Sequence, residues 1–171
     1  VIIVFDGMRT DAWDELLRPI FQERFDLVAE SPGSAIIPTE TQLSRKAISA
    51  GVLPDQFTTG NELKLLQQWL RQNMGLQPKF AVMKDEEQVK SGISVYFTSD
   101  KLDYIVFNFT DKNLHEADDL ARFYNTTVRD LIREDVRSVI HNLPEDALVF
   151  ITSDHGFAPV SDTPVSIPET A

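Results

Sequence analysis

Acidic side chains follow three of the clearest apolar runs in the chain, and they are the residues best suited to chemistry. VIIVF ends in Asp6, YIVFNFT ends in Asp111, and LVFITS ends in Asp154 and His155. Because the carboxyl ends of parallel strands meet at one edge of a sheet, we expect these carboxylates to lie close together. Close carboxylates repel one another in a partly dry cleft, and a divalent cation is the simplest way to neutralise them. The pattern therefore predicts a metal site.

Two histidines add nitrogen ligands to this set. His155 directly follows Asp154, and His115 stands four residues after Asp111, which is one helical turn. Asp together with His suits zinc, or manganese, better than calcium. Asp111 and His115 could equally be a helix-capping residue and a surface histidine, whereas a capped loop rarely needs Asp and His together after a buried strand. His141 stands at a predicted helix end, where a histidine favours the helix dipole, so we assign it no role in a site.

A hydroxyl at a predicted helix start is the next candidate. The segment PTETQLSR, which begins at Pro38, places Thr41 where a helix should begin. Threonine is a good N-cap, so the arrangement needs no chemistry to explain it. Beside a cation, however, the same hydroxyl would be an activated nucleophile, and the helix amides would receive the oxygens of a phosphoryl group. We expect Gln42 and Arg45 to bind the substrate, although Arg45 could instead pair with a surface acid.

The elements that must position these residues alternate between strand and helix. Apolar runs predict strands at 1–5, 79–83, 103–109 and 147–152, with short extended pieces at 26–30 and 35–37. Helical periodicity predicts helices at 10–26, 41–50, 62–73 and 114–142, the first divided by a proline and the last broken once. This alternation favours an α/β fold: a three-layer sandwich in which helices cover both faces of a mostly parallel central sheet.

Composition narrows the class of protein. The 171 residues are 42% apolar, which is normal for a globular domain. With 16 basic and 27 acidic residues the net charge is −11, so the chain is a poor general nucleic-acid binder, although a bound cation could create a local positive site. There is no cysteine, which excludes disulfides and thiolate metal sites. No apolar run approaches the roughly 20 residues of a membrane span, so we expect a cytoplasmic protein without a membrane partner.

Because the chain begins in mid-strand, we expect residues 1–171 to be one domain of a longer protein.

The motifs, taken in order, resemble a known superfamily. VFDG, PTETQLSRKAISAG, TDKNLH and TSDHGF resemble the alkaline phosphatase superfamily of metal-dependent phosphoesterases. The segments TETQLSRKAISAG and DGMRTDAW look more closely like the PglZ domain, which is found in phage-defence (BREX) proteins and in some response regulators. The resemblance covers residues 1 to about 157 and implies an alkaline-phosphatase-like core.

The resemblance also implies roles for individual residues. One metal would be held by Asp6, Thr41, Asp154 and His155, and a second metal by Asp111 and His115. Thr41 would be the nucleophile in preference to Thr39, because the second threonine of the pattern stands at the helix start. The superfamily usually adds a further histidine to the second metal, but this sequence has none after His155. That ligand would lie beyond Ala171, or the second site would be weak or empty.

Three functions remain to be compared. The first is a metal-dependent phosphoesterase, a phosphodiesterase rather than a monoesterase, that uses one or two zinc or manganese ions on a phosphate ester such as a nucleotide or oligonucleotide. The second is a non-catalytic module that binds a metal or nucleotide and serves assembly in a defence or signalling complex with the other domains of its parent protein. A flavodoxin-like receiver domain also clusters Asp at strand ends, but it has no use for Asp154 and His155. The missing histidine favours the second function for the isolated chain, and the intact Thr41 and Asp6 favour the first for its parent.

Overall fold

A parallel sheet forms the centre of the molecule. The computed structural model describes residues 1–57, 60–76, 81–85, 102–114, 119, 122–123 and 129–157. Within these residues the sheet has four strands in the order β2-β3-β1-β4. The strands are β1 (Ile2–Phe5), β2 (Ala81–Asp85), β3 (Leu102–Phe107) and β4 (Phe150–Ser153). All three pairs of neighbouring strands are parallel, so the predicted α/β class with a parallel sheet is confirmed.

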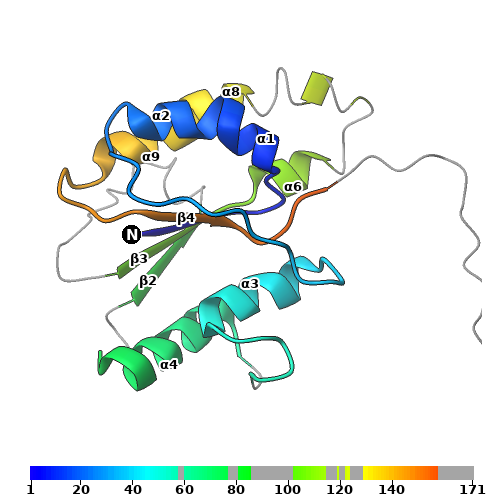
Figure 1. Ribbon diagram of the computed structural model, residues 1–171, viewed down its shortest axis with the longest axis vertical. Helices are drawn as coiled ribbons and strands as arrows, with labels where there is room; N and C mark the ends of the chain where they lie inside the picture. The colour runs from blue at the N-terminus through cyan, green and yellow to red at the C-terminus, as the bar shows by residue number, and fades with distance from the viewer. Residues whose placement is uncertain are drawn as a thin grey trace, which may run out of the picture.

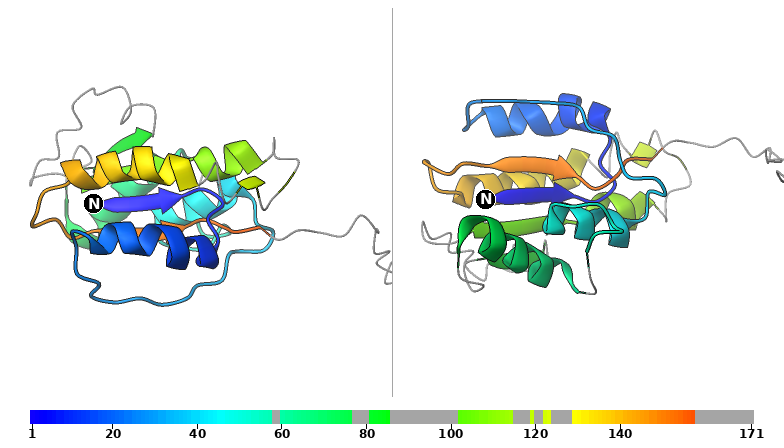
Figure 2. Two further views of the ribbon diagram at one scale, coloured as in Figure 1. Left: turned by 90° about the horizontal axis from the view of Figure 1, so that it is seen from above. Right: turned by 60° about the horizontal axis from the view of Figure 1, so that its bottom comes forward.

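Helices lie on both faces of this sheet (Figures 1 and 2). One face carries the helical segments α1 (Thr10–Ala12), η1 (Trp13–Leu17), α2 (Arg18–Gln22), α8 (Arg129–Leu131), η4 (Ile132–Val136) and α9 (Arg137–Asn142). The opposite face carries α3 (Thr41–Ala50) and α4 (Glu62–Met74). A further helix, α6 (Phe109–Leu114), follows β3.

Strand alternation explains why the sheet needs cover on both faces. Successive side chains of a strand point to opposite faces. Ile3 and Phe5 accordingly join the core under α2 and α9, whereas Val4 joins Leu66 and Leu70 of α4 in a second core. All three β1 side chains are 0–1% exposed. The β1 strand is therefore fixed from both sides, and so is the point where it ends.

The helix bounds agree with the sequence patterns where a cap residue marks them. Gly51 and Gly75 end α3 and α4 in the left-handed conformation, and Asn61 caps α4 by accepting a hydrogen bond from the Lys64 amide. The helix predicted at 10–26 ends at Gln22. It is divided by the π-helical segment η1, which ends two residues before Pro19 and is closed by the bond from the Arg18 amide to the Trp13 carbonyl oxygen. Proline fits there because it has no amide hydrogen to donate.

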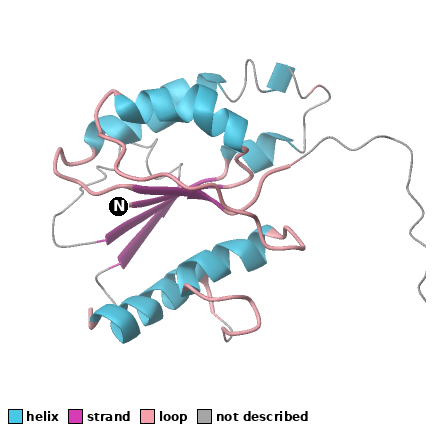
Figure 3. Ribbon diagram, in the orientation of Figure 1, coloured by secondary structure: helices cyan, strands magenta, loops and turns pink. Residues whose placement is uncertain are grey.

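Two predicted extended pieces are wrong. Residues 26–30 and 35–37 lie in the long loop that connects α2 with α3 past β4 (Figure 3). The sequence Ser-Pro-Gly-Ser at 31–34, which favours a turn, separates them, and neither piece offers a run long enough to pair with the sheet. The predicted helix at 114–142 is present at its end, from α8 through α9, and the segment between 115 and 128 lies almost entirely outside the described residues.

The strand ends place the candidate residues. Phe5 pairs with Phe107 on one side and with Ser153 on the other. The residues that follow these three are Asp6, Asn108 and Asp154, so they leave the sheet at the same level. Asp111 does not: β3 ends at Phe107, and Asp111 lies in the first turn of α6. The prediction that a strand leads directly to Asp111 is wrong, because the chain turns into a helix at Phe109 although the apolar run continues.

Membrane-spanning helices do not occur in the part of the chain that the structure describes.

Candidate functional site

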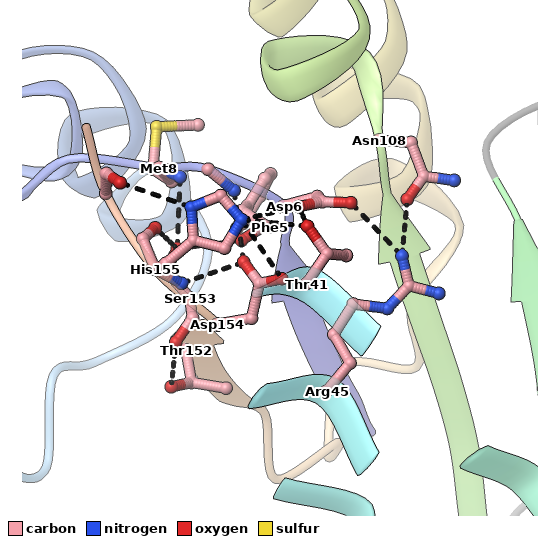
Figure 4. Close-up of polar contacts among 12 residues, drawn as sticks. Phe5, Asp6, Met8, Thr41, Arg45, Asn108, Thr152, Ser153, Asp154 and His155 are labelled. Carbon is pink, nitrogen blue, oxygen red and sulfur yellow. Dashed lines mark hydrogen bonds and ion pairs between the residues drawn. The ribbon is translucent and has the colours of Figure 1, made fainter. Parts of the chain in front are cut away.

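Three side chains from distant parts of the chain meet at the carboxyl edge of the sheet (Figure 4). Asp6 follows β1, Thr41 is the first residue of α3, and His155 follows β4. The Thr41 hydroxyl lies 3.0 Å from His155 Nε2 and 3.5 Å from Asp6 Oδ1. His155 Nε2 lies 3.4 Å from the same oxygen of Asp6. Parallel strands and a helix start thus bring together residues that are up to 149 positions apart in sequence.

Asp154 completes the group, with one oxygen engaged and one available. Its Oδ1 accepts hydrogen bonds from the amides of Gly7, at 3.1 Å, and His155, at 2.8 Å. Its Oδ2 is buried, has no hydrogen-bond partner among the described residues, and lies 3.7 Å from His155 Nε2. A buried carboxylate oxygen without a donor is costly, and a cation is what it would bind. Ligand atoms of Asp6, Asp154 and His155 all lie within 4.8 Å of one another.

The ring of His155 presents its free nitrogen to this group. Nδ1 lies 3.2 Å from the Gly156 carbonyl oxygen. A carbonyl oxygen only accepts, so Nδ1 donates the hydrogen in this contact, and in the neutral form of such a ring Nε2 keeps its lone pair. Nε2 is the nitrogen that faces Asp6, Thr41 and Asp154. This arrangement, with the second ring nitrogen bonded to a carbonyl, is the one that protein metal ligands favour.

The surroundings of Asp6 raise the pKa of its carboxyl group. Burial, followed by the negative charge of Asp154, raises the pKa of Asp6 to about 6. The negative charge of Asp111 raises the pKa of Asp6 further, and the positive charge of Arg45 lowers it. Burial and the two neighbouring carboxylates together therefore outweigh the effect of Arg45 on the pKa of Asp6.

Arg45, the predicted substrate-binding residue of α3, lies beside Asp6. Its Nη1 donates to Asp6 Oδ2 at 3.1 Å and to Asn108 Oδ1 at 3.0 Å, and its Nη2 donates to Glu62 Oε1 at 2.6 Å. Arg45 therefore contacts Asp6 from the side opposite Thr41 and His155, and its acidic partners are not exposed surface residues. Asn108 and Glu62 were missed from the sequence, and only the position of Asn108 directly after an apolar run could have indicated it.

Hydrogen bonds of Ser153 and Gly7 hold together the loops that follow β1 and β4. Ser153 Oγ accepts from the Met8 amide at 3.0 Å and lies 2.8 Å from the Phe5 carbonyl oxygen and 2.7 Å from that of His155. Gly7 adopts a φ of 69°, a conformation that favours glycine, and this turn aims its amide at Asp154. The loop after β1 is thus tied to the loop after β4.

The remaining predicted residues are not part of the cluster in the described part of the chain. Asp111 lies close enough to affect Asp6 electrostatically, and its Cβ would be 3.4 Å from a Cβ placed on Gly7. It is not one of the three residues whose ligand atoms converge. Gln42 is exposed in the first turn of α3. His115 lies outside the described residues, so its predicted role as a ligand stays a prediction.

Comparison with known proteins agrees with the sequence resemblance. No curated protein that was compared matches the chain significantly. A family model does match: the BREX system PglZ alkaline phosphatase-like domain, over residues 1–164 of the 171. That match includes the strand ends, the start of α3 and the Asp154-His155 pair, and it shows that the chain belongs to the PglZ family of alkaline phosphatase-like domains.

Proposed function

We propose that this domain is a metal-dependent phosphoesterase, a phosphodiesterase rather than a monoesterase, that acts in phage defence with Thr41 as its nucleophile. The observation that supports this most strongly is the position of Thr41. Its hydroxyl stands at a helix start, 3.0 Å from His155 and 3.5 Å from Asp6. Structural capping does not need an acid and a histidine from two other strand ends.

The donor set fits a divalent cation. Asp6, Asp154 and His155 would hold it, with the Thr41 oxygen close enough to be a fourth ligand. The partnerless Oδ2 of Asp154 and the lone pair of His155 Nε2 both face the common space. Two carboxylates and an imidazole suit zinc or manganese. When bound, such a cation would lower the pKa of the Thr41 hydroxyl and offset the negative charge of a phosphoryl group.

The amino end of α3 is suited to receive phosphoryl oxygens. The first amides of a helix have no partner within the helix, and the helix dipole favours an anion there. Glu40, which precedes α3, makes no side-chain capping bond to it. The amides of Leu43 and Ser44 bond to the Glu40 carbonyl oxygen, so an anion that approaches Thr41 would meet the amides of Thr41 and Gln42. Gln42 is exposed in the same turn and remains our candidate for a substrate contact.

The bond changes follow from these positions. Thr41 Oγ1 would form a bond to phosphorus in line with the scissile ester bond, and its proton would pass to solvent. The leaving oxygen would depart with the electron pair of the ester bond. Water would then attack phosphorus and release Thr41 with its proton restored. We expect Asp111 and His115 to hold a second metal near the leaving oxygen, as the resemblance implies.

A hydrolysis assay tests the proposal. The full chain is supplied with zinc or manganese and with an aryl phosphodiester, and release of the aryl alcohol is followed for Thr41→Ala and Asp154→Ala. Loss of about 10³-fold or more in each is expected, because the nucleophile or a ligand is gone. Thr39→Ala, two residues before the helix, is the matched control and should keep wild-type turnover. Unchanged turnover in both Thr41→Ala and Asp154→Ala would contradict the proposed function. A wild type that binds metal but does not hydrolyse the diester would favour the non-catalytic module.

A further inference from the structure

The largely buried guanidinium of Arg45 contacts Asp6, one of the candidate metal ligands. The side chain of Arg45 is 15% exposed, and so is that of Glu62. Arg45 comes from α3, Glu62 from the first turn of α4, and Asn108 from the end of β3. Three separate elements therefore converge on one charged group. Figure 4 shows Arg45 reaching from α3 between Asp6 and Asn108.

The two oxygens of Asp6 face different partners. Oδ2 accepts the hydrogen bond from Arg45 Nη1. Oδ1 faces the site, 3.5 Å from the Thr41 hydroxyl and 3.4 Å from His155 Nε2. Occupation of Oδ2 by Arg45 thus decides which oxygen is presented to the site.

Arg45 and Glu62 do not form the strongest ion pair that their two side chains could make. An Arg–carboxylate pair is strongest when two parallel hydrogen bonds join it. Arg45 instead makes one bond to Glu62 and turns Nη1 toward Asp6 and Asn108. Two buried atoms, Arg45 Nε and Glu62 Oε2, are left without a partner among the described residues. A two-bond pair through Nε and Nη2 would satisfy both atoms, and the observed orientation of the guanidinium, with Nη1 at Asp6 and Asn108, does not form it.

We propose that Arg45 is a positioning residue for Asp6, and that Glu62 and Asn108 hold its guanidinium in place for this purpose. The inference rests on the proposed metal site and assigns that site a support built from α4 and β3. Arg45 fixes the Asp6 carboxylate so that Oδ1 is ready as a ligand before any metal arrives. Supporting residues of this kind typically change metal affinity by 10–100-fold when they are removed.

Charge alone makes the opposite prediction, which makes the proposal testable. If Arg45 acted only as a nearby positive charge, its removal would relieve repulsion of the incoming cation and tighten binding. If Arg45 orients Asp6, its removal loosens binding even though a positive charge has gone. The sign of the change therefore separates the two roles.

The experiment measures Zn²⁺ affinity of the full chain at pH 8 by competition with a chromophoric chelator. Arg45→Met and Glu62→Gln should each weaken binding by about tenfold or more. Arg45→Lys keeps the charge but lacks the fork of donors, and should weaken binding too. Lys46→Met, which removes a positive charge from the next residue of α3, is the matched control and should bind as the wild type does.

Each result then has one reading. Wild-type or tighter binding by Arg45→Met and Arg45→Lys overturns the positioning role and leaves the proposed function intact. A wild type that binds no Zn²⁺ contradicts the proposed function itself, and the inference with it. Circular dichroism checks the fold of each variant, and if Arg45→Met does not fold, Arg45→Lys and Glu62→Gln decide. Crystals of metal-free Arg45→Lys provide a second measurement: the Asp6 carboxylate should be rotated, and an unchanged orientation would also overturn the role.

Discussion

The Thr41 hydroxyl and His155 Nε2 lie 3.0 Å apart although 114 positions separate them in the sequence. The contact joins the start of α3 to the end of β4, across the edge at which β1 also ends. Neither residue needs the other for folding, since helix starts and strand ends are routinely completed by local partners. Their proximity to Asp6 and Asp154 is the relationship from which the proposed chemistry follows.

Zinc should stabilise the domain through Asp154. Its Oδ2 is buried without a partner among the described residues, so a bound cation would convert an unfavourable group into a ligand. A ligand at a hundred times its dissociation constant stabilises the folded state by about 2.7 kcal/mol. Thermal unfolding of the wild type should shift upward on addition of Zn²⁺, and that of Asp154→Ala should shift little. Equal shifts in both proteins would place the bound zinc elsewhere.

Asp6 predicts a pH dependence of the metal-free protein. Burial and Asp154 raise its pKa from 3.8 to about 6, so the folded state holds this proton more tightly than the unfolded chain does. The stability contributed by protonated Asp6 is therefore complete below pH 4 and is lost as the pH rises through about 6. A difference of about two pH units corresponds to roughly 3 kcal/mol at most.

Asp6→Asn tests this dependence because the amide cannot ionise. Urea unfolding with a chelator present should show the wild type losing stability, relative to Asp6→Asn, between pH 4 and pH 7. Parallel pH profiles for the two proteins would show that the carboxyl titrates normally.

The turn at Gly7 predicts a backbone effect on the site. Gly7 has a φ of 69°, and a Cβ there would lie 3.4 Å from the Cβ of Asp111. An L-residue in this conformation costs about 1–2 kcal/mol, so Gly7→Ala should lower the free energy of unfolding by about that amount. It should also weaken Zn²⁺ binding, because the Gly7 amide holds Asp154. Gly33→Ala is the control: apart from its chain neighbours, no atom of the described residues lies within 4 Å of a Cβ at that position, and its stability should be unchanged. Equal stability of the two variants would contradict the strained turn.

Local sequence signals predicted most of the scaffold that holds the site. Apolar runs fixed β1 and β4 to within a few residues, and Gly51, Asn61 and Gly75 marked helix ends because each performs a capping role that depends on its own residue type. The start of α3 at Thr41 was also predicted, although the N-cap residue is Glu40 and Thr41 is the first residue of the helix. Asp6 and Asp154 then meet as a consequence of the parallel register.

The rest of the site depends on packing that no local signal encodes. Phe109 continues the apolar run of β3 yet begins α6, where it packs in the same core as Phe107, and Asp111 therefore lies in a helix and not at the strand end. Glu62 reads as an ordinary acidic residue in the first turn of a helix. Its contact with Arg45 exists only because α3 and α4 pack side by side.

The stereochemical course of hydrolysis tests the Thr41 mechanism most directly. A phosphorothioate diester of known configuration at phosphorus is hydrolysed by the metal-loaded full chain in ¹⁸O-labelled water, and the configuration of the product is determined. Attack by Thr41 followed by attack of water gives two in-line inversions, so the account predicts net retention. Net inversion would show that water attacks phosphorus directly, and would contradict Thr41 as the nucleophile.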